Sequence, residues 1–151
     1  MSFFKNKWAI ATIVLALSTI IASSLSIYYY YQYSELLKKI QGTTIHVNLG
    51  INDGKTTKWF NGTAIKSGSS LLDLTMLVAN VNYTIYPGMG AFVNSINRLE
   101  NSHPYYWMWW MWTSYGWMEG PIAADKYIVG DGETLFWYYE DTSISPLPTP
   151  P

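Results

Sequence analysis

The stretch Tyr105–Trp112, YYWMWWMW, places eight large apolar side chains in succession. Successive side chains of a strand point to opposite faces, so Trp107 and Trp109 share one face and Trp110 and Trp112 share the other. Both faces are therefore apolar. We expect this stretch to form a strand that has to be covered on two sides.

A single amphipathic helix is available to cover one side. Ser67-Gly68-Ser69-Ser70 precedes an apolar series that starts at Leu71 and predicts a helix of about ten residues. The serines supply helix caps, and Asp73 falls in the first turn, where a negative charge is favourable.

The remaining outer region is predicted to form strands and turns. A hairpin is expected around the turn Asn52-Asp53-Gly54. The predicted strands and short extended segment are Thr43–Leu49, Thr56–Asn61, Ala91–Ile96, Tyr105–Trp112, Lys126–Val129 and Thr134–Tyr139. This order predicts an α+β fold in which a mixed sheet wraps around one helix, the β-grasp pattern.

The second face of the aromatic strand is the main candidate for function. It needs cover from the loop that carries Tyr115, Trp117 and Met118, from a partner, from a flat ligand or from a membrane, since large exposed apolar patches mark interaction sites. The candidate partner or ligand residues are Trp107, Trp109, Trp110, Trp112, Tyr115 and Trp117.

Motifs across residues 43–141 resemble a known family. In order they are Gly68-Ser69-Ser70-Leu71-Leu72-Asp73, Gly90–Asn97 (GAFVNSIN), Tyr106-Trp107-Met108, Asp125–Glu133 (DKYIVGDGE) and Phe136-Trp137-Tyr138-Tyr139. Their order and spacing are similar to those of the transcobalamin-like C-terminal domains. The resemblance implies a β-grasp module of the kind found in exported bacterial and archaeal proteins.

The sequence departs from the family pattern at two turns. Thr113–Gly120 replaces an Asn-Gly turn after the tryptophan strand, and Asn97-Arg98 replaces another after the middle strand. In the cobalamin carriers this module caps a ligand that is held mainly by a large helical domain. We expect no such domain here, so cobalamin binding is not transferred.

The N-terminal region predicts a membrane anchor. Trp8–Ile27 is uncharged for twenty residues, and tyrosines at 28–31 and 33 form an interfacial belt. Lys5 and Lys7 favour a cytoplasmic N-terminus, although Lys38 and Lys39 oppose them. A secretory signal with a cleavage site near Ala22–Ser26 is the alternative. Both interpretations export the rest of the chain.

We therefore divide the chain into five regions. They are a short cytoplasmic tail (1–7), a transmembrane anchor or uncleaved signal (8–33), a linker or helix extension (34–42), an extracellular β-grasp domain (43–141) and a proline-rich tail (142–151). Ser34–Ile40 is expected to continue the membrane helix until Gly42.

Composition narrows the function classes. The net charge of −1 argues against nucleic-acid binding, and the absence of cysteine excludes disulfides and thiolate metal sites. Asn61 and Asn82 begin glycosylation sequons. Charged residues make up only 13 %, which would suit an acidic exterior and resembles exported proteins of thermoacidophilic archaea.

Catalytic and metal sites find little support in the sequence. His46 and His103, together with the methionines at 89, 108, 111 and 118, suggest copper by residue type, but no pair has ligand spacing. Met108 and Met111 point to opposite faces of one strand. No nucleophile elbow, carboxylate pair or phosphate loop occurs, so we predict no catalytic residues, no metal and no cofactor.

The function predicted from the sequence is a single-pass, membrane-anchored extracellular binding or assembly module that is not an enzyme. It would dock a protein partner, or a second copy of itself, through the aromatic strand. The alternatives are a binding module for a flat apolar cofactor or a glycan, and a copper-binding accessory subunit.

Overall fold

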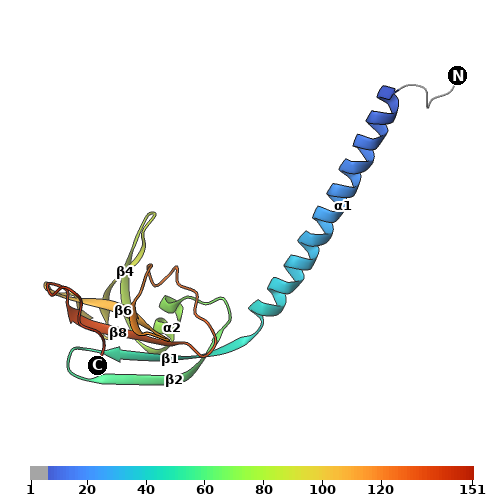
Figure 1. Ribbon diagram of the computed structural model, residues 1–151. Coiled ribbons are helices and arrows are strands. Elements are labelled where there is room, and N and C mark those ends of the chain that lie inside the picture. The colour runs from blue at the N-terminus through green and yellow to red at the C-terminus, as the bar shows by residue number, and fades with distance from the viewer. Residues whose placement is uncertain (1–6) are drawn as a thin grey trace. The chain divides into compact units, whose positions relative to one another are not determined.

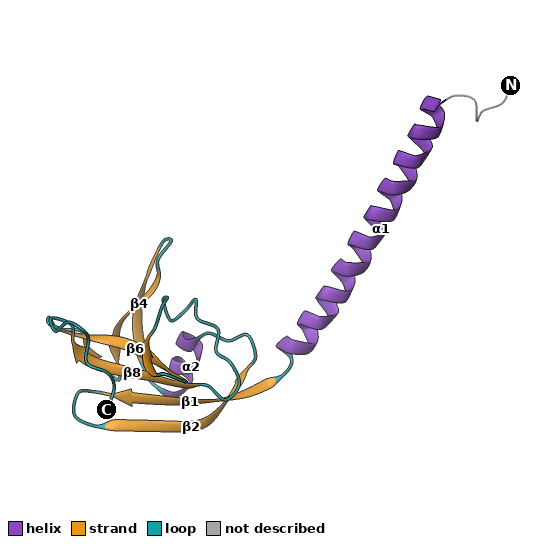
Figure 2. Cartoon of the chain, in the orientation of Figure 1, coloured by secondary structure: helices purple, strands orange, loops and turns teal. Residues whose placement is uncertain are grey.

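The computed structural model describes residues 7–151, so Lys5 and most of the predicted 1–7 tail lie outside the described residues. The chain separates into two compact units, residues 1–40 and 41–151. In the described part, the first unit consists of one long helix, and the second contains all the strands and a short helix (Figures 1 and 2). The fold is α+β, as predicted.

Helix α1 (Lys7–Gln41) has 35 residues and ends directly before Gly42, so the predicted continuation through Ser34–Ile40 is confirmed. Most of its apolar side chains are exposed; Leu15, for example, is 68 % exposed. One helix within residues 7–151 is long and apolar enough to cross a membrane, and it spans Lys7–Leu37. A signal sequence meets the same criterion.

The larger sheet has five strands in the order β2-β1-β8-β6-β7. Strands β1 and β8 pair in parallel and the other neighbours pair antiparallel, so the sheet is mixed. The strands are β1 (Thr44–Asn52), β2 (Thr57–Lys66), β6 (Tyr105–Thr113), β7 (Gly116–Glu119) and β8 (Thr134–Asp141). With one helix packed on it, this sheet is the predicted β-grasp arrangement.

A second sheet has the strand order β3-β4-β5. Its strands are β3 (Val81–Tyr86), β4 (Gly90–Ile96) and β5 (Leu99–Glu100). Of these, only β4 was predicted as a separate strand. The β4–β5 turn retains the geometry of the missing Asn-Gly pair, because Asn97 and Arg98 both adopt left-handed conformations, with φ of 52° and 70°.

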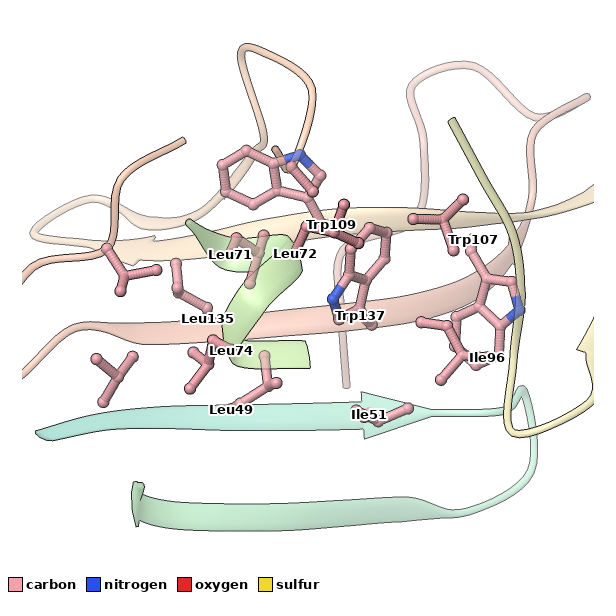
Figure 3. Packing of buried hydrophobic residues seen from close by; sticks show 14 of the residues in the cluster. Leu49, Ile51, Leu71, Leu72, Leu74, Ile96, Trp107, Trp109, Leu135 and Trp137 are labelled. Carbon is pink, nitrogen blue, oxygen red and sulfur yellow. The ribbon is translucent and has the colours of Figure 1, made fainter. Parts of the chain in front are cut away.

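Helix α2 (Leu71–Val78) begins with the predicted serine cap. Ser70 Oγ accepts from the Asp73 amide, and the Asp73 carboxylate accepts from the Ser70 amide, which completes a capping box. Leu71 and Leu74 are fully buried against the sheet (Figure 3). Trp137 of β8 donates from Nε1 to Thr75 Oγ1 over 2.8 Å, so the helix and the sheet share one buried hydrogen bond.

Candidate functional site

The inner face of β6 belongs to the core. Trp107 and Trp109 are only 5 % and 6 % exposed and lie on the same side of the sheet as α2 (Figure 3). Each indole Nε1 donates to a backbone carbonyl over 2.9 Å, Trp107 to Leu99 and Trp109 to Ile122. One face of the aromatic strand is therefore packed on the helix side, as the alternation predicted.

The outer face of β6 is covered in its middle by the chain itself. Trp110 is 5 % exposed, and Phe136 of β8 is fully buried beside it. The Phe136 ring contacts Trp59 and Trp117, with centroid separations of 5.3 and 5.4 Å. The sequence left four possibilities for what covers this face: the chain itself, a partner, a flat ligand or a membrane. Packing within the chain is the one that covers its centre.

The proline-rich segment after β8 also packs on the domain. Residues 142–151 contain no helix or strand, yet Pro150 is buried. Thr142 anchors the start of the segment, since its amide and hydroxyl both donate to the Pro104 carbonyl over 3.0 Å. Figure 1 shows this red segment folded back toward the sheet after β8.

Part of the exposed aromatic area of the domain lies at the β6–β7 hairpin. Tyr115 is fully exposed in the turn, and Trp112 is 57 % exposed. Trp117 is half-buried and meets Trp112 edge-on, with ring centroids 5.2 Å apart. Of the six candidate residues, the structure thus places three in the interior and brings Trp112, Tyr115 and Trp117 together at the hairpin.

A cleft that the sequence did not predict opens between β4 and β6. It has a volume of about 460 Å³. Its walls are mainly apolar and include Met89, Phe92, Val93, Trp107, Trp109 and Ile122. A cleft of this size with apolar walls falls within the range of binding pockets for small molecules and side chains.

Two glycines shape this cleft by allowing close contacts. A Cβ at Gly120 would overlap the Trp109 ring, so the chain after β7 can lie on that indole only because no side chain intervenes. Gly90 has φ of +103°, and a Cβ there would lie 2.6 Å from Asp125 Oδ1. These two positions let the loop 120–125 lie directly against Trp109 of β6 and against the start of β4.

Asp125 follows the lining residues Ala123 and Ala124 and is bonded to β4. Its Oδ1 accepts from the Ala91 amide over 2.7 Å, and its Oδ2 lies 3.4 Å from Lys126 Nζ. The bond from the Ala91 amide, more than the lysine charge, lowers the pKa of Asp125. The carboxylate is therefore ionised where it holds β4 in place.

A second cleft of about 430 Å³ lies at the β1–β2 turn. Its rim includes Asp53, Lys55 and Lys58, and its floor includes Trp107 and Tyr139. Backbone amides of Thr56 and Lys55 donate to the Asp53 carboxylate and lower its pKa. Because these bonds close the turn itself, Asp53 serves the hairpin geometry.

Metal ligands are not assembled in the described part of the chain. No group of three or more His, Cys, Asp or Glu side chains within residues 7–151 could hold a metal ion. His46 and His103 are both exposed. Met108 lines the β4–β6 cleft, whereas Met111 packs on the core, so the two methionines diverge as predicted.

The two predicted sequons lie on exposed positions. Asn61 is in β2, at the edge of the larger sheet, and Asn82 is in β3. Both side chains are exposed, so each is accessible to a glycosylating enzyme. Glycosylation itself stays a prediction.

The comparisons with known proteins agree with this fold. Residues 68–141 match the family model described as "Domain of unknown function (DUF4430)". The match covers 74 of the 151 residues, and its family is the transcobalamin-like one that the motifs of the sequence resemble. No curated protein matches the chain.

Two solved structures are similar. Haptocorrin, crystallised in complex with Cbi, has a TM-score of 0.53 and 19 % identity over 66 % of this chain. The similar region is 26 % of the haptocorrin chain, so this chain spans about a quarter of that protein. A Ruminococcus gnavus protein described as a candidate metal-binding protein has a TM-score of 0.48 and 14 % identity, over 64 % of this chain and 97 % of its own.

Proposed function

We propose that this protein is a membrane-anchored, extracellular binding module without catalytic activity, and that it holds a protein partner in the cleft between β4 and β6. The observation that carries the proposal is the cleft itself, which is apolar, about 460 Å³ in volume and built on two strands of the folded core. Sites on rigid strands fix their ligand better than sites on loops.

The anchor rests on α1. Its side chains between Trp8 and Tyr33 are apolar or aromatic over most of the length and are mostly exposed. Exposing such a surface to water is unfavourable by about 25 cal/mol for each Å² of apolar area, so an apolar environment is the favourable place for this helix. Cleavage of a signal sequence, the alternative, would release the same binding domain outside the cell.

A test of the site compares two substitutions of exposed isoleucines. Ile122 lines the cleft and is 49 % exposed, so Ile122→Trp should fill the cleft without disturbing the core. Ile128 is 55 % exposed and is absent from the cleft lining, so Ile128→Trp is the matched control. The tagged full-length proteins are purified from native membranes.

The proposal expects a protein that co-purifies with the wild type and with Ile128→Trp but is lost with Ile122→Trp. Equal recovery with both variants would place the binding site elsewhere. The predicted location is tested in the same preparation, because retention of the N-terminal peptide in the membrane fraction, seen by mass spectrometry, distinguishes an anchor from a cleaved signal.

The second candidate function is binding of a glycan or flat apolar ligand at the β6–β7 hairpin. It is favoured by the full exposure of Tyr115 and the edge-on pair of Trp112 and Trp117. Aromatic faces of this kind bind apolar and sugar-ring surfaces. Loss of tryptophan quenching by such ligands in Trp112→Ser, but not in Ile122→Trp, would select this function.

A further inference from the structure

The second cleft, at the β1–β2 turn, is separate from the site proposed for the protein partner. Its floor lies at one end of the core, where Ile51, Ile96 and Trp107 are buried (Figure 3). Leu99 and Tyr139 also line the floor. Among the described residues, Trp107 is the only one that lines both clefts. A ligand held here would therefore add a function to the proposed one.

The aromatic side chains of the floor have their polar ends bonded inside the domain. Trp107 Nε1 donates to the Leu99 carbonyl over 2.9 Å, and the Tyr139 hydroxyl donates to the Glu100 carbonyl over 2.9 Å. The two rings lie 5.2 Å apart and are tilted by 52°. With these polar ends occupied, the floor offers mainly carbon surface. Such walls suit a flat apolar body better than a glycan, whose hydroxyl groups need hydrogen-bond partners.

The rim carries two lysines and one aspartate. Asp53 is held by the turn, because the Lys55 and Thr56 amides donate to its Oδ1 over 2.9 and 2.7 Å. The ammonium groups of Lys55 and Lys58 form no ion pair with a carboxylate among the described residues. Lys58 Nζ lies 4.9 Å from the centroid of the Phe60 ring, which lines the same cleft. The rim therefore has one positive charge in excess, and one of its cations lies against an apolar wall.

We propose that this cleft binds a small organic anion with a flat apolar body. The anionic group pairs with Lys55 and Lys58 at the rim and balances the excess positive charge. The apolar body packs on Trp107 and Tyr139. The volume of about 430 Å³ is within the usual range for a small-molecule pocket.

The same rim sets the charge of the ligand. The two lysines attract an anion, but Asp53 is ionised beside them, since its hydrogen bonds to the turn amides lower its pKa. A polyanion such as a nucleoside diphosphate would bring further negative charge near this carboxylate, which is unfavourable. A neutral molecule would leave both lysines without a partner. We therefore expect one carboxylate or sulfonate group.

The test uses naphthalene-2-carboxylate and its uncharged analogue naphthalene-2-carboxamide, with the full-length ¹⁵N-labelled protein in a non-ionic detergent. Dialysis sets the same free concentration of each probe, so uptake into micelles does not enter the comparison. Binding is measured from the backbone amide shifts of Lys58 and Leu99, which both line the cleft. The double variant Lys55→Met/Lys58→Met removes both charges and keeps apolar side chains of similar length. Lys66→Met is the matched control, because Lys66 is an exposed lysine of the same strand and is absent from the lining.

We expect the carboxylate to shift both backbone amides and the carboxamide to bind about fivefold more weakly, the effect of one exposed ion pair. The double variant should bind the two probes equally, whereas Lys66→Met should keep the wild-type preference. The inference is overturned if millimolar carboxylate shifts neither amide, or if the wild type binds both probes equally. It is also overturned if the preference survives in the double variant or is lost in Lys66→Met.

Discussion

Glu140 should make the stability of this protein decrease between weakly acidic and neutral pH. The side chain is 1 % exposed on the outer face of the sheet. Its Oε1 accepts from Trp110 Nε1 over 3.0 Å, and its Oε2 has no partner within residues 7–151. Burial, strengthened by the nearby charge of Glu119, raises the pKa of Glu140 from 4.5 to about 7.

The direction of the effect follows from proton binding. Between pH 4.5 and about 7 the folded protein keeps the Glu140 proton, while the unfolded chain has lost it. Stability therefore falls as the pH rises through this interval and is constant above it. The difference between a pKa of 4.5 and one of about 7 corresponds to about 3 kcal/mol in the free energy of unfolding.

The variant Glu140→Gln removes the titration and keeps an acceptor for Trp110. Urea unfolding of the full-length protein in detergent, followed by tryptophan fluorescence, should give equal stabilities for wild type and variant near pH 4. At pH 8 the variant should be more stable by about 2–3 kcal/mol. Glu100→Gln is the control, because its side chain is exposed and the substitution should change stability at pH 8 by less than about 1 kcal/mol.

Comparison of variant with wild type separates Glu140 from the other acids. Asp53 and Asp125 have lowered pKa values, so their contributions are lost only as the pH falls toward the acid end of the range, and they cancel in the difference. A difference that stays constant from pH 4 to pH 8 would refute the assignment of a raised pKa to Glu140.

Three further changes test the packing. Deletion of Ser143–Pro151 should lower the urea midpoint and increase ANS fluorescence, because Pro150 is buried on the domain; an unchanged midpoint would mean that the segment covers nothing. Gly120→Ala should cost about 1–3 kcal/mol, measured by the same unfolding assay, because the new Cβ overlaps the Trp109 ring; full stability would contradict that contact. Tyr115→Ser should change stability by less than about 1 kcal/mol while reducing any self-association seen by light scattering, and stronger self-association would exclude the hairpin as the contact.

The elements with strong local signals were predictable from the sequence. The capped apolar series at Ser70 and Leu71 gave the helix, and the turn at Asn52–Gly54 gave the hairpin. Strands β3, β5 and β7 were not predicted as separate elements, and two of them have only two and four residues. Such short strands depend on pairing with β4 and β6, which are chosen by the tertiary fold rather than by local propensity.

The candidate site was only partly predictable for a related reason. Alternation correctly placed Trp109 and Trp110 on opposite faces of one strand. Part of the cover of this outer face comes from Trp59 and Trp117, which contact the ring of Phe136 beside Trp110 and are brought there by the tertiary fold. Periodicity carries no information on contacts of that range.

The cleft arises because β6 and β7 differ in length. The sequence pattern does not predict this difference. Strand β6 has nine residues but β7 has only four, so the edge of β6 from Tyr105 to Trp109 lacks a neighbouring strand. An open edge invites unwanted pairing, and proteins usually cover it with side chains or loops. Here Asn101 covers one end and the loop after β7 covers the other. Between these two covered ends the cleft remains, and its apolar walls come from β4, β6 and the loop after β7.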